Sequence, residues 1–236
     1  MKRDKPIIAI DGPAGVGKSS VSKDLAHALA YTYLDTGALY RAVAWKVMEM
    51  AIPLNDMVKL RKLCEEIDIS CTATDNGTAV SVDGYDVSSQ IRREDVSALA
   101  SQVSALPVVR EMLLPIQRKM SRHGGVVAEG RDMGTVVFPD ADVKFFLTAT
   151  LTERANRRYY QLLEKEMAAN YVDIVREMET RDRQDSGRDI APLKPADDAI
   201  IIDTTEIQKN TVVKNMLDII IKKKESQKCS DDGLLS

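Results

Sequence analysis

The chain has 236 residues, of which 44% are hydrophobic and 29% are charged. At roughly 150 residues per domain, this length predicts one large domain or one domain with an embellishment. The composition excludes a disordered chain, a collagen-like fibre and a small protein held together by disulfides. A formal net charge of −3 gives no indication of nucleic-acid binding. The positive charge is nevertheless uneven, because seven of the sixteen arginines fall between residues 154 and 188.

Short apolar runs alternate with segments of helical periodicity along most of the chain. Residues 6–10 are apolar on both faces and end at Asp11-Gly12-Pro13, which predicts a central strand of a parallel sheet. This alternation implies an α/β fold, a parallel sheet with helices on both faces. The other predicted strands are 31–34, 126–128, 143–147 and 199–202, and the predicted helices are those starting at Lys18 and those over 39–50, 92–105, 107–122, 151–167, 172–179 and 212–220.

One stretch departs from this alternation. Apolar and polar residues alternate from Ile67 to Cys71 and again from Val80, with Asn76-Gly77 between the two runs. Asn-Gly between alternating runs is a strong hairpin signal, so we predict a small antiparallel meander over about 67–87.

The ends of the chain and its cysteines carry little functional information. The charged N-terminus runs directly into the first strand without the pattern of a signal peptide, and no apolar stretch approaches eighteen residues. Cys64 and Cys71 are expected to be buried thiols, because the three cysteines lack metal-ligand spacing. The lysine-rich and then polar segment 223–236 is expected to be a flexible tail. We therefore expect a cytoplasmic protein that contacts no membrane.

The strongest local signal follows the first strand. Gly12-Pro13-Ala14-Gly15-Val16-Gly17-Lys18-Ser19 fits the pattern G-x-x-x-x-G-K-S/T, between a strand and a helix. The glycines let successive backbone N–H groups turn toward phosphate oxygens, and the helix N-terminus adds partial positive charge. Lys18 would reach the β- and γ-phosphates, and the Ser19 hydroxyl would bind Mg²⁺ directly or through water. A glycine-rich turn that binds nothing is the alternative.

The arginines indicate which kind of phosphate chemistry follows. The chain has no guanine-reading Asn-Lys-x-Asp, and Val126-Val127-Ala128-Glu129 ends in glutamate and leads directly into Gly130-Arg131-Asp132, unlike the corresponding strand of a motor ATPase. Transfer between two phosphorylated molecules brings several negative charges together, so it needs cations beyond lysine and magnesium. Guanidinium groups suit this task because they bind phosphate bidentately and stay charged.

Three of these arginines lie on one predicted helix. Arg154, Arg157 and Arg158 fall opposite the stripe of Leu151, Ala155, Tyr159 and Leu162, where they would line a mobile cover over the donor phosphates.

Several longer segments resemble a known family. The run from Ala128 to Pro139 (AEGRDMGTVVFP) is similar to the signature of bacterial-type cytidylate kinases. The segments at 35–41 (DTGALYR), at 100–104 with Val109-Arg110, and at 181–188 (RDRQDSGR) also resemble that family, and the likeness extends from about residue 6 to about 222. The departures are Ser19, where the family often has glycine, and Thr36, where it often has serine. The first leaves metal ligation open.

The resemblance implies five parallel strands, a nucleoside-monophosphate-binding insertion and a helical lid. The core would comprise 6–40, 107–150 and 190–222, the insertion about 41–106, and the lid about 151–189. It also implies ATP-dependent phosphorylation of CMP and dCMP, with Mg²⁺ accompanying ATP. Partners would be these small molecules, with no nucleic acid, and the protein would be a monomer.

The resemblance also implies roles for individual residues. ATP would be bound by Gly12, Pro13, Ala14, Gly15, Val16, Gly17, Lys18, Ser19 and Ser20. Ser101, Arg110 and Asp132 would read the cytosine edge, and Arg41, Arg131 and Arg188 would hold the acceptor phosphate. Arg181 and Asp185 would lie near the sugar, Thr36, Gly37 and Tyr40 would contact CMP, and Arg157 and Arg158 would belong to the lid. The residues that act in catalysis would be Lys18, Arg131, Arg157, Arg158 and Arg188.

Plainer interpretations stay open for some of these residues. Asp132 could pair with Arg131, Ser101 could be an ordinary polar helix position, and Tyr40 could pack against the insertion. Two other functions also stay open. One is a kinase for another monophosphate or a small metabolite, and the other is a nucleotide-binding module without catalysis.

Overall fold

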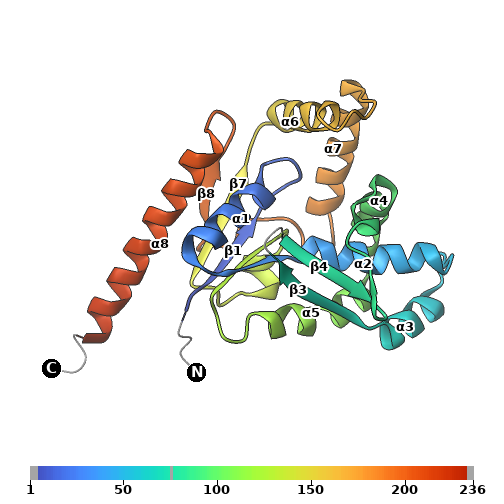
Figure 1. Ribbon diagram of the computed structural model, residues 1–236, viewed down its shortest axis with the longest axis horizontal. Helices are drawn as coiled ribbons and strands as arrows, with labels where there is room; N and C mark the ends of the chain where they lie inside the picture. Colours follow the sequence, from blue (N-terminus) through green and yellow to red (C-terminus); the bar gives the residue numbers. More distant parts are fainter. Residues whose placement is uncertain (1–4, 75–76, 233–236) are drawn as a thin grey trace.

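A five-stranded sheet lies at the centre of the computed structural model, which describes residues 5–74 and 77–232 (Figure 1). The strand order is β2-β6-β1-β7-β8 and every pairing is parallel, as the sequence predicts. In a parallel sheet the carboxyl ends of all strands meet at one edge, where ligands gather in α/β folds. The strands are β1 (Ile7–Asp11), β2 (Thr32–Asp35), β6 (Val126–Gly130), β7 (Val143–Thr148) and β8 (Ile200–Asp203).

Helices cover both faces of this sheet because its central strand is apolar on both sides. Ile8 and Ile10 of β1 pack with α1 (Lys18–Leu29) and α8 (Lys209–Asp232). Ile7 and Ala9 point to the other face. There they pack with the π-helix η2 (Met133–Val137) and with side chains of α5 (Pro107–Met120).

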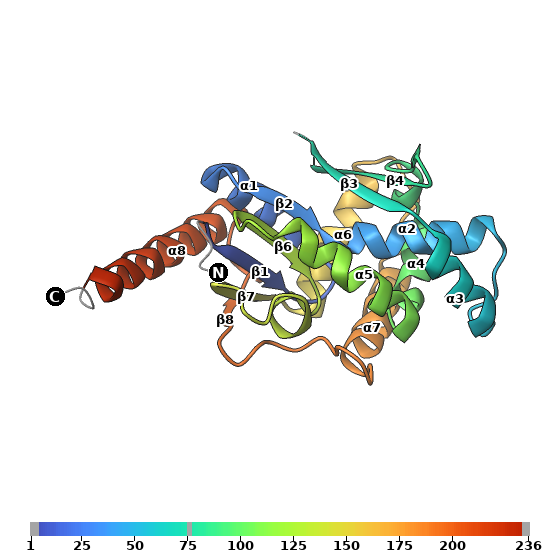
Figure 2. The same ribbon diagram turned by 90° about the horizontal axis from the view of Figure 1, so that it is seen from below.

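The elements of the insertion between β2 and α5 lie together beside the sheet (Figure 2). They share one apolar core with α5, built from α2, α3, α4 and α5 with Val80 and Val82 of the meander. The predicted meander is present as three antiparallel strands. Asp75 and Asn76 of the predicted turn lie outside the described residues. The elements of this region are α2 (Thr36–Glu49), α3 (Met57–Glu66), β3 (Ile69–Thr74), β4 (Gly77–Val82), β5 (Tyr85–Asp86), the 3-10 helix η1 (Gln90–Arg92) and α4 (Glu94–Val103).

Two helices form the segment predicted as a lid, α6 (Leu151–Leu163) and α7 (Tyr171–Ser186). The predicted stripe of α6 packs against α7, with Ala155 and Leu162 buried. Helix α7 continues seven residues past its predicted end at Glu179. The apolar pattern stops there, but Asp185 lies two turns beyond Met178 and is buried on the same side of the helix, in an ionic site.

The C-terminal segment is largely helical, and the expectation for one of the cysteines was wrong. Helix α8 runs to Asp232, so most of the expected flexible tail is helical. The segment contains no glycine or proline before Gly233, and Lys224 donates to the Tyr31 hydroxyl at 2.9 Å, which ties this stretch to the sheet. Cys64 is buried as expected, but Cys71 is only half-buried. In the described part of the chain, no helix is long and apolar enough to cross a membrane.

Candidate active site

The glycine-rich loop predicted from the sequence connects β1 to α1. Gly12 has φ of 147°, and a Cβ atom there would lie 2.2 Å from the carbonyl oxygen of Leu147, so only glycine fits. Gly17, with φ of 91°, is the N-cap of α1 and adopts the left-handed conformation. The loop is therefore shaped by backbone requirements at two of its glycines.

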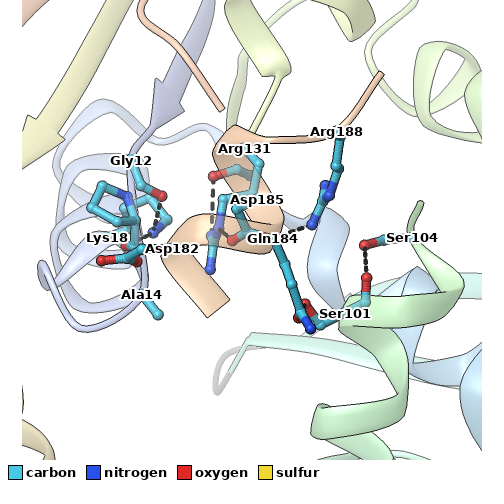
Figure 3. Close-up of polar contacts among 12 residues, drawn as sticks. Gly12, Ala14, Lys18, Ser101, Ser104, Arg131, Asp182, Gln184, Asp185 and Arg188 are labelled. Carbon is cyan, nitrogen blue, oxygen red and sulfur yellow. Dashed lines mark hydrogen bonds and ion pairs between the residues drawn. The ribbon is translucent and has the colours of Figure 1, made fainter. Parts of the chain in front are cut away.

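Lys18 lies buried at the start of α1 with its side chain folded over the loop. Its Nζ donates to the carbonyl oxygens of Gly12 and Pro13 at 2.7 and 2.6 Å (Figure 3). Burial lowers the pKa of Lys18, and the positive charge of Arg131 lowers it further. Anionic phosphate would relieve both effects. Ser19 and Ser20 follow on the exposed side of the helix.

Glu129 lies beside the loop at the end of β6, and sequence reasoning assigned it no role. It is buried, and Tyr33 of β2 donates a hydrogen bond to its Oε1. Burial raises the pKa of Glu129, as does Asp35, whereas Lys18 and polar contacts with Tyr33 and Ser19 lower it. Its position at the carboxyl end of a parallel strand, next to the loop, was the signal that could have found it.

The residues expected to read cytosine include a buried ion pair. Arg110 of α5 pairs with Asp132, just after β6, and also donates to the carbonyl oxygen of Ser104 at 3.1 Å. The alternative pairing of Asp132 with Arg131 is therefore wrong. The Tyr40 ring lies 5.7 Å from the Arg110 guanidinium, and burial raises the pKa of Tyr40 to about 12. Tyr40 thus packs against the insertion and against this pair.

Asp185 of α7 gathers two of the arginines expected to hold a phosphate. It is 1% exposed and pairs with Arg131 at 2.8 Å and with Arg188 (Figure 3). Burial alone would raise the pKa of Asp185, but Arg131 and Arg188 hold it below its usual value. In Figure 3 this group lies between the glycine loop and α4, so it faces both halves of the site.

Arg181 adds another cation to the same cluster. Burial lowers its pKa to about 10, and the neighbouring charges of Arg131, Arg41 and Arg188 contribute. The Nε atoms of Arg41, Arg181 and Arg188 are buried and have no hydrogen-bond partner among the described residues. Buried donors are normally satisfied, so unpaired donors on three clustered guanidinium groups indicate a site for an anion.

The segment predicted from 35 to 41 lies at the start of α2. Asp35 caps this helix by accepting from the backbone N–H of Ala38 at 3.1 Å, and it pairs with Arg41 at 2.6 Å. A Cβ atom on Gly37 would lie 3.0 Å from Arg41 Nη1, so glycine leaves room for this pair. Thr36 is buried, and its hydroxyl donates to the carbonyl oxygen of Glu129 at 2.7 Å, which joins α2 to the sheet.

Ser101 lies on the inner side of α4, opposite α7. It is 9% exposed and donates to Gln184 at 3.4 Å, and its carbonyl accepts from Ser104 at 2.8 Å (Figure 3). Ser101 therefore lies between α4 and α7 and not toward solvent, and its expected role in reading cytosine stays a prediction.

The three lid arginines do not act as one row. Arg154 is buried, donates to the carbonyl oxygen of Ala14 at 3.1 Å and pairs with Asp182 at 2.6 Å. Arg157 donates to Thr204 Oγ1 at 3.1 Å, behind the loop. Arg158 instead pairs with Glu94 of α4 at 2.6 Å, so the structure does not bring it to the glycine loop. The helical spacing predicted which side of α6 these arginines lie on, but it could not predict which residues they contact.

Asp11 is a further buried carboxylate, and it links the segment before the glycine loop to the segment after β6. Asp11, the last residue of β1, accepts from the backbone N–H groups of Met133 and Gly134, both at 2.8 Å. Met133 directly follows Asp132, so Asp11 connects the end of β1, where the glycine loop begins, to the segment that carries Asp132. Burial raises the pKa of Asp11 to about 6.

The fold resembles that of a solved kinase structure. A gluconokinase from Sinorhizobium meliloti superimposes with a TM-score of 0.52 at 14% identity, over 97% of this chain and 99% of that one. At this identity the likeness concerns the fold alone.

Sequence comparison is more specific. The family model described as cytidylate kinase matches residues 8–222. A protein named cytidylate kinase from Syntrophotalea carbinolica is 46% identical over 230 residues, which cover 98% of each chain. Another, from Carboxydothermus hydrogenoformans, is 47% identical over 218 residues, 92% of this chain and 98% of the relative. With the predicted loop and the arginine cluster in one fold, this chain belongs to the cytidylate kinase family.

Proposed function

We propose that this protein carries out the reaction its family name describes, the transfer of the γ-phosphoryl group of MgATP to CMP or dCMP. The observation that carries the proposal is the cluster of Arg41, Arg181 and Arg188, whose Nε donors are buried and have no hydrogen-bond partner among the described residues. Several positive charges held close together and partly buried repel one another unless an anion is present. Such a cluster is therefore the arrangement expected of a site that binds a phosphate.

The donor would occupy the loop from Gly12 to Ser20. Lys18 would exchange its bonds to the loop carbonyls for bonds to the β- and γ-phosphates. Arg157, which already contacts the back of the loop, would add positive charge from the lid side.

Magnesium would neutralise part of the phosphate charge when it is bound with the nucleotide. The residues present fit such an ion, because the exposed Ser19 hydroxyl lies beside Glu129, whose buried Oε2 has no partner among the described residues. Oxygen donors of this kind are those that magnesium prefers.

The acceptor would bind between α4 and the arginine cluster. Arg41, Arg131 and Arg188 would hold its phosphate, with Arg181 and Asp185 near the sugar. Cytosine offers an amino donor beside two acceptors, so a carboxylate and a guanidinium such as Asp132 and Arg110 complement it. Uracil would leave one of these groups mismatched.

Catalysis on this proposal needs no side-chain base. The acceptor phosphate is already anionic, so the protein contributes positioning and charge stabilisation. Arg158 would release Glu94 and join the donor phosphates when the lid closes, which would exclude water from the reacting groups. We also propose that the insertion (about 41–106) and the lid (about 151–189) move toward each other, and that the protein is a cytoplasmic monomer.

A panel of acceptors tests the substrate assignment. ADP formation from ATP should be fast with CMP and dCMP and much slower with UMP, AMP or GMP. Equal turnover with another monophosphate would indicate a different substrate, and no ADP release with any acceptor would indicate a nucleotide-binding module.

Single substitutions test the site. Lys18→Ala and Arg131→Ala should each lower kcat with CMP by about 100-fold or more, as loss of a positive group aimed at transferring phosphate does. Lys62→Ala is the matched control, because this lysine is 72% exposed on α3, and it should leave kcat unchanged. Near-normal turnover of Lys18→Ala would contradict the proposed donor site.

A further inference from the structure

Tyr33 has no role in the function proposed above, yet it lies at the donor side of the site. It is on β2, whose residues pair in register with β6, Tyr33 with Val127 and Asp35 with Glu129. Side chains two residues apart on a strand point to the same face, so Tyr33, Asp35 and Glu129 all face the side of the sheet that α1 covers.

Helix α1 holds the Tyr33 ring on the opposite side. Ser19 and Lys23 are four residues apart on α1 and therefore lie on one face of that helix. The Lys23 ammonium group lies 5.6 Å from the centre of the Tyr33 ring, and the Ser19 side chain makes a polar contact with Tyr33. Tyr33 is thus fixed between the loop helix and the sheet.

The Tyr33 hydroxyl donates to Glu129 Oε1. The other carboxylate oxygen, Oε2, is buried and has no partner among the described residues. The neighbouring carboxylate, Asp35, is engaged differently, because its oxygens accept from the Ala38 N–H and from Arg41. Of Asp35 and Glu129, only Glu129 keeps an oxygen beside the loop that has no hydrogen-bond partner among the described residues.

We propose that Tyr33 is a positioning residue for the donor site, whose hydroxyl fixes Glu129 so that its second oxygen stays available to the cation that accompanies the nucleotide. This inference rests on the function proposed above. A group that orients a carboxylate toward a metal ion affects metal affinity without touching the ion or the substrate.

The variants Tyr33→Phe and Glu129→Gln test this proposal when ADP binding is measured by calorimetry, once with saturating Mg²⁺ and once with a chelator. In Tyr33→Phe, the affinity for ADP with Mg²⁺ divided by the affinity for ADP with chelator should fall roughly tenfold. This is the size expected for loss of a group that orients a metal ligand. Binding of metal-free ADP should be unchanged. Glu129→Gln should lower the ratio by at least as much.

Two further variants separate positioning from a general structural effect. Tyr31→Phe removes the hydroxyl of a nearby tyrosine that contacts Lys224, away from the loop, and should leave both affinities unchanged. The double variant Tyr33→Phe/Glu129→Gln should be no worse than Glu129→Gln, since Tyr33 acts through Glu129.

The proposal is overturned if Tyr33→Phe weakens metal-free and metal-loaded ADP equally, or changes neither, or adds fully to Glu129→Gln. In those cases the wild-type acceptor panel would still decide the phosphotransfer function by itself. If the wild-type protein phosphorylates no acceptor while the metal ratio responds as described, the proposed function fails and the role of Tyr33 stands.

Discussion

The proposed acceptor side, which includes the C-terminal turns of α7, and the lid helix α6 both contain several arginines, but they hold them in different ways. On the acceptor side, the side chains of Asp132 and Asp185 are 4% and 2% exposed, and they pair with the largely buried Arg110 and Arg188 and the half-buried Arg131. On α6, apart from the buried Arg154, the carboxylate partners of Arg157 and Arg158 are Glu153 and Glu94, whose side chains are 32% and 58% exposed. The first set is enclosed in protein, and the second remains in contact with water.

This difference follows from what each region must do. A buried pair costs several kcal/mol to break, so the acceptor arginines keep their geometry before substrate arrives. An exposed pair contributes at most about 1 kcal/mol, so a lid arginine can exchange its carboxylate for a phosphate at little cost. All the cations are arginines, so the difference between a fixed pair and an exchangeable one depends on how deeply its carboxylate is buried.

The largest expected effect comes from breaking the buried set. Asp185→Ala leaves Arg131 and Arg188 without their shared partner and should lower the free energy of unfolding by about 3–5 kcal/mol. Urea denaturation measures it. Asp173→Ala is the control on the same helix, because its pair with Arg176 spans 3.8 Å at the surface. Equal losses in the two variants would remove the distinction drawn here.

A smaller effect is expected at Asp11, which is buried but bonds to backbone N–H groups and not to a guanidinium. Its pKa is raised from 3.8 to about 6, mainly by burial. Above pH 6 Asp11 is charged in the folded protein, and the cost of burying that charge lowers the free energy of unfolding. This destabilisation is relieved as pH falls through 6. As the pH falls from 7 to 5, the free energy of unfolding of the wild type should therefore rise by about 1 kcal/mol relative to that of Asp11→Asn. Urea titrations of both proteins at the two pH values test this, and parallel changes would contradict it.

The smallest effect should come from the lid. Glu94→Gln removes the exposed partner of Arg158 and should change the free energy of unfolding by less than about 1 kcal/mol. Because salt screens exposed pairs, the difference from wild type should vanish in high salt. A salt-independent loss of several kcal/mol would mean that the lid pair is as fixed as the acceptor pairs.

Prediction from sequence succeeded where the signal is local. The glycine loop is contiguous, and its strand and helix are each marked by a short apolar pattern, so the loop and its place between β1 and α1 were predicted from the sequence. The meander was predictable because Ile67 to Cys71 and the run from Val80 alternate with period two. Helix α3 was missed although Asp56 caps it and Leu60, Leu63 and Cys64 have helical spacing.

The sequence could not specify which side chains pair with each other when the partners lie far apart in the chain. Asp132 pairs with Arg110, not with the adjacent Arg131, because α5 presents the Arg110 side chain to the buried end of β6. Arg131 pairs with Asp185 across 54 residues. The end of α7 was misplaced for the same reason, since its last turns are stabilised by ionic contacts that leave no apolar period.

The amino-acid order alone determined the phosphate-binding loop, the α/β alternation and a set of arginines suited to anions, because these depend on neighbours within a few residues. Only the tertiary structure decided which arginines are buried together, which carboxylate holds each one and which oxygen is left unpaired beside the loop. Those outcomes depend on desolvation, and desolvation is set by how distant segments pack.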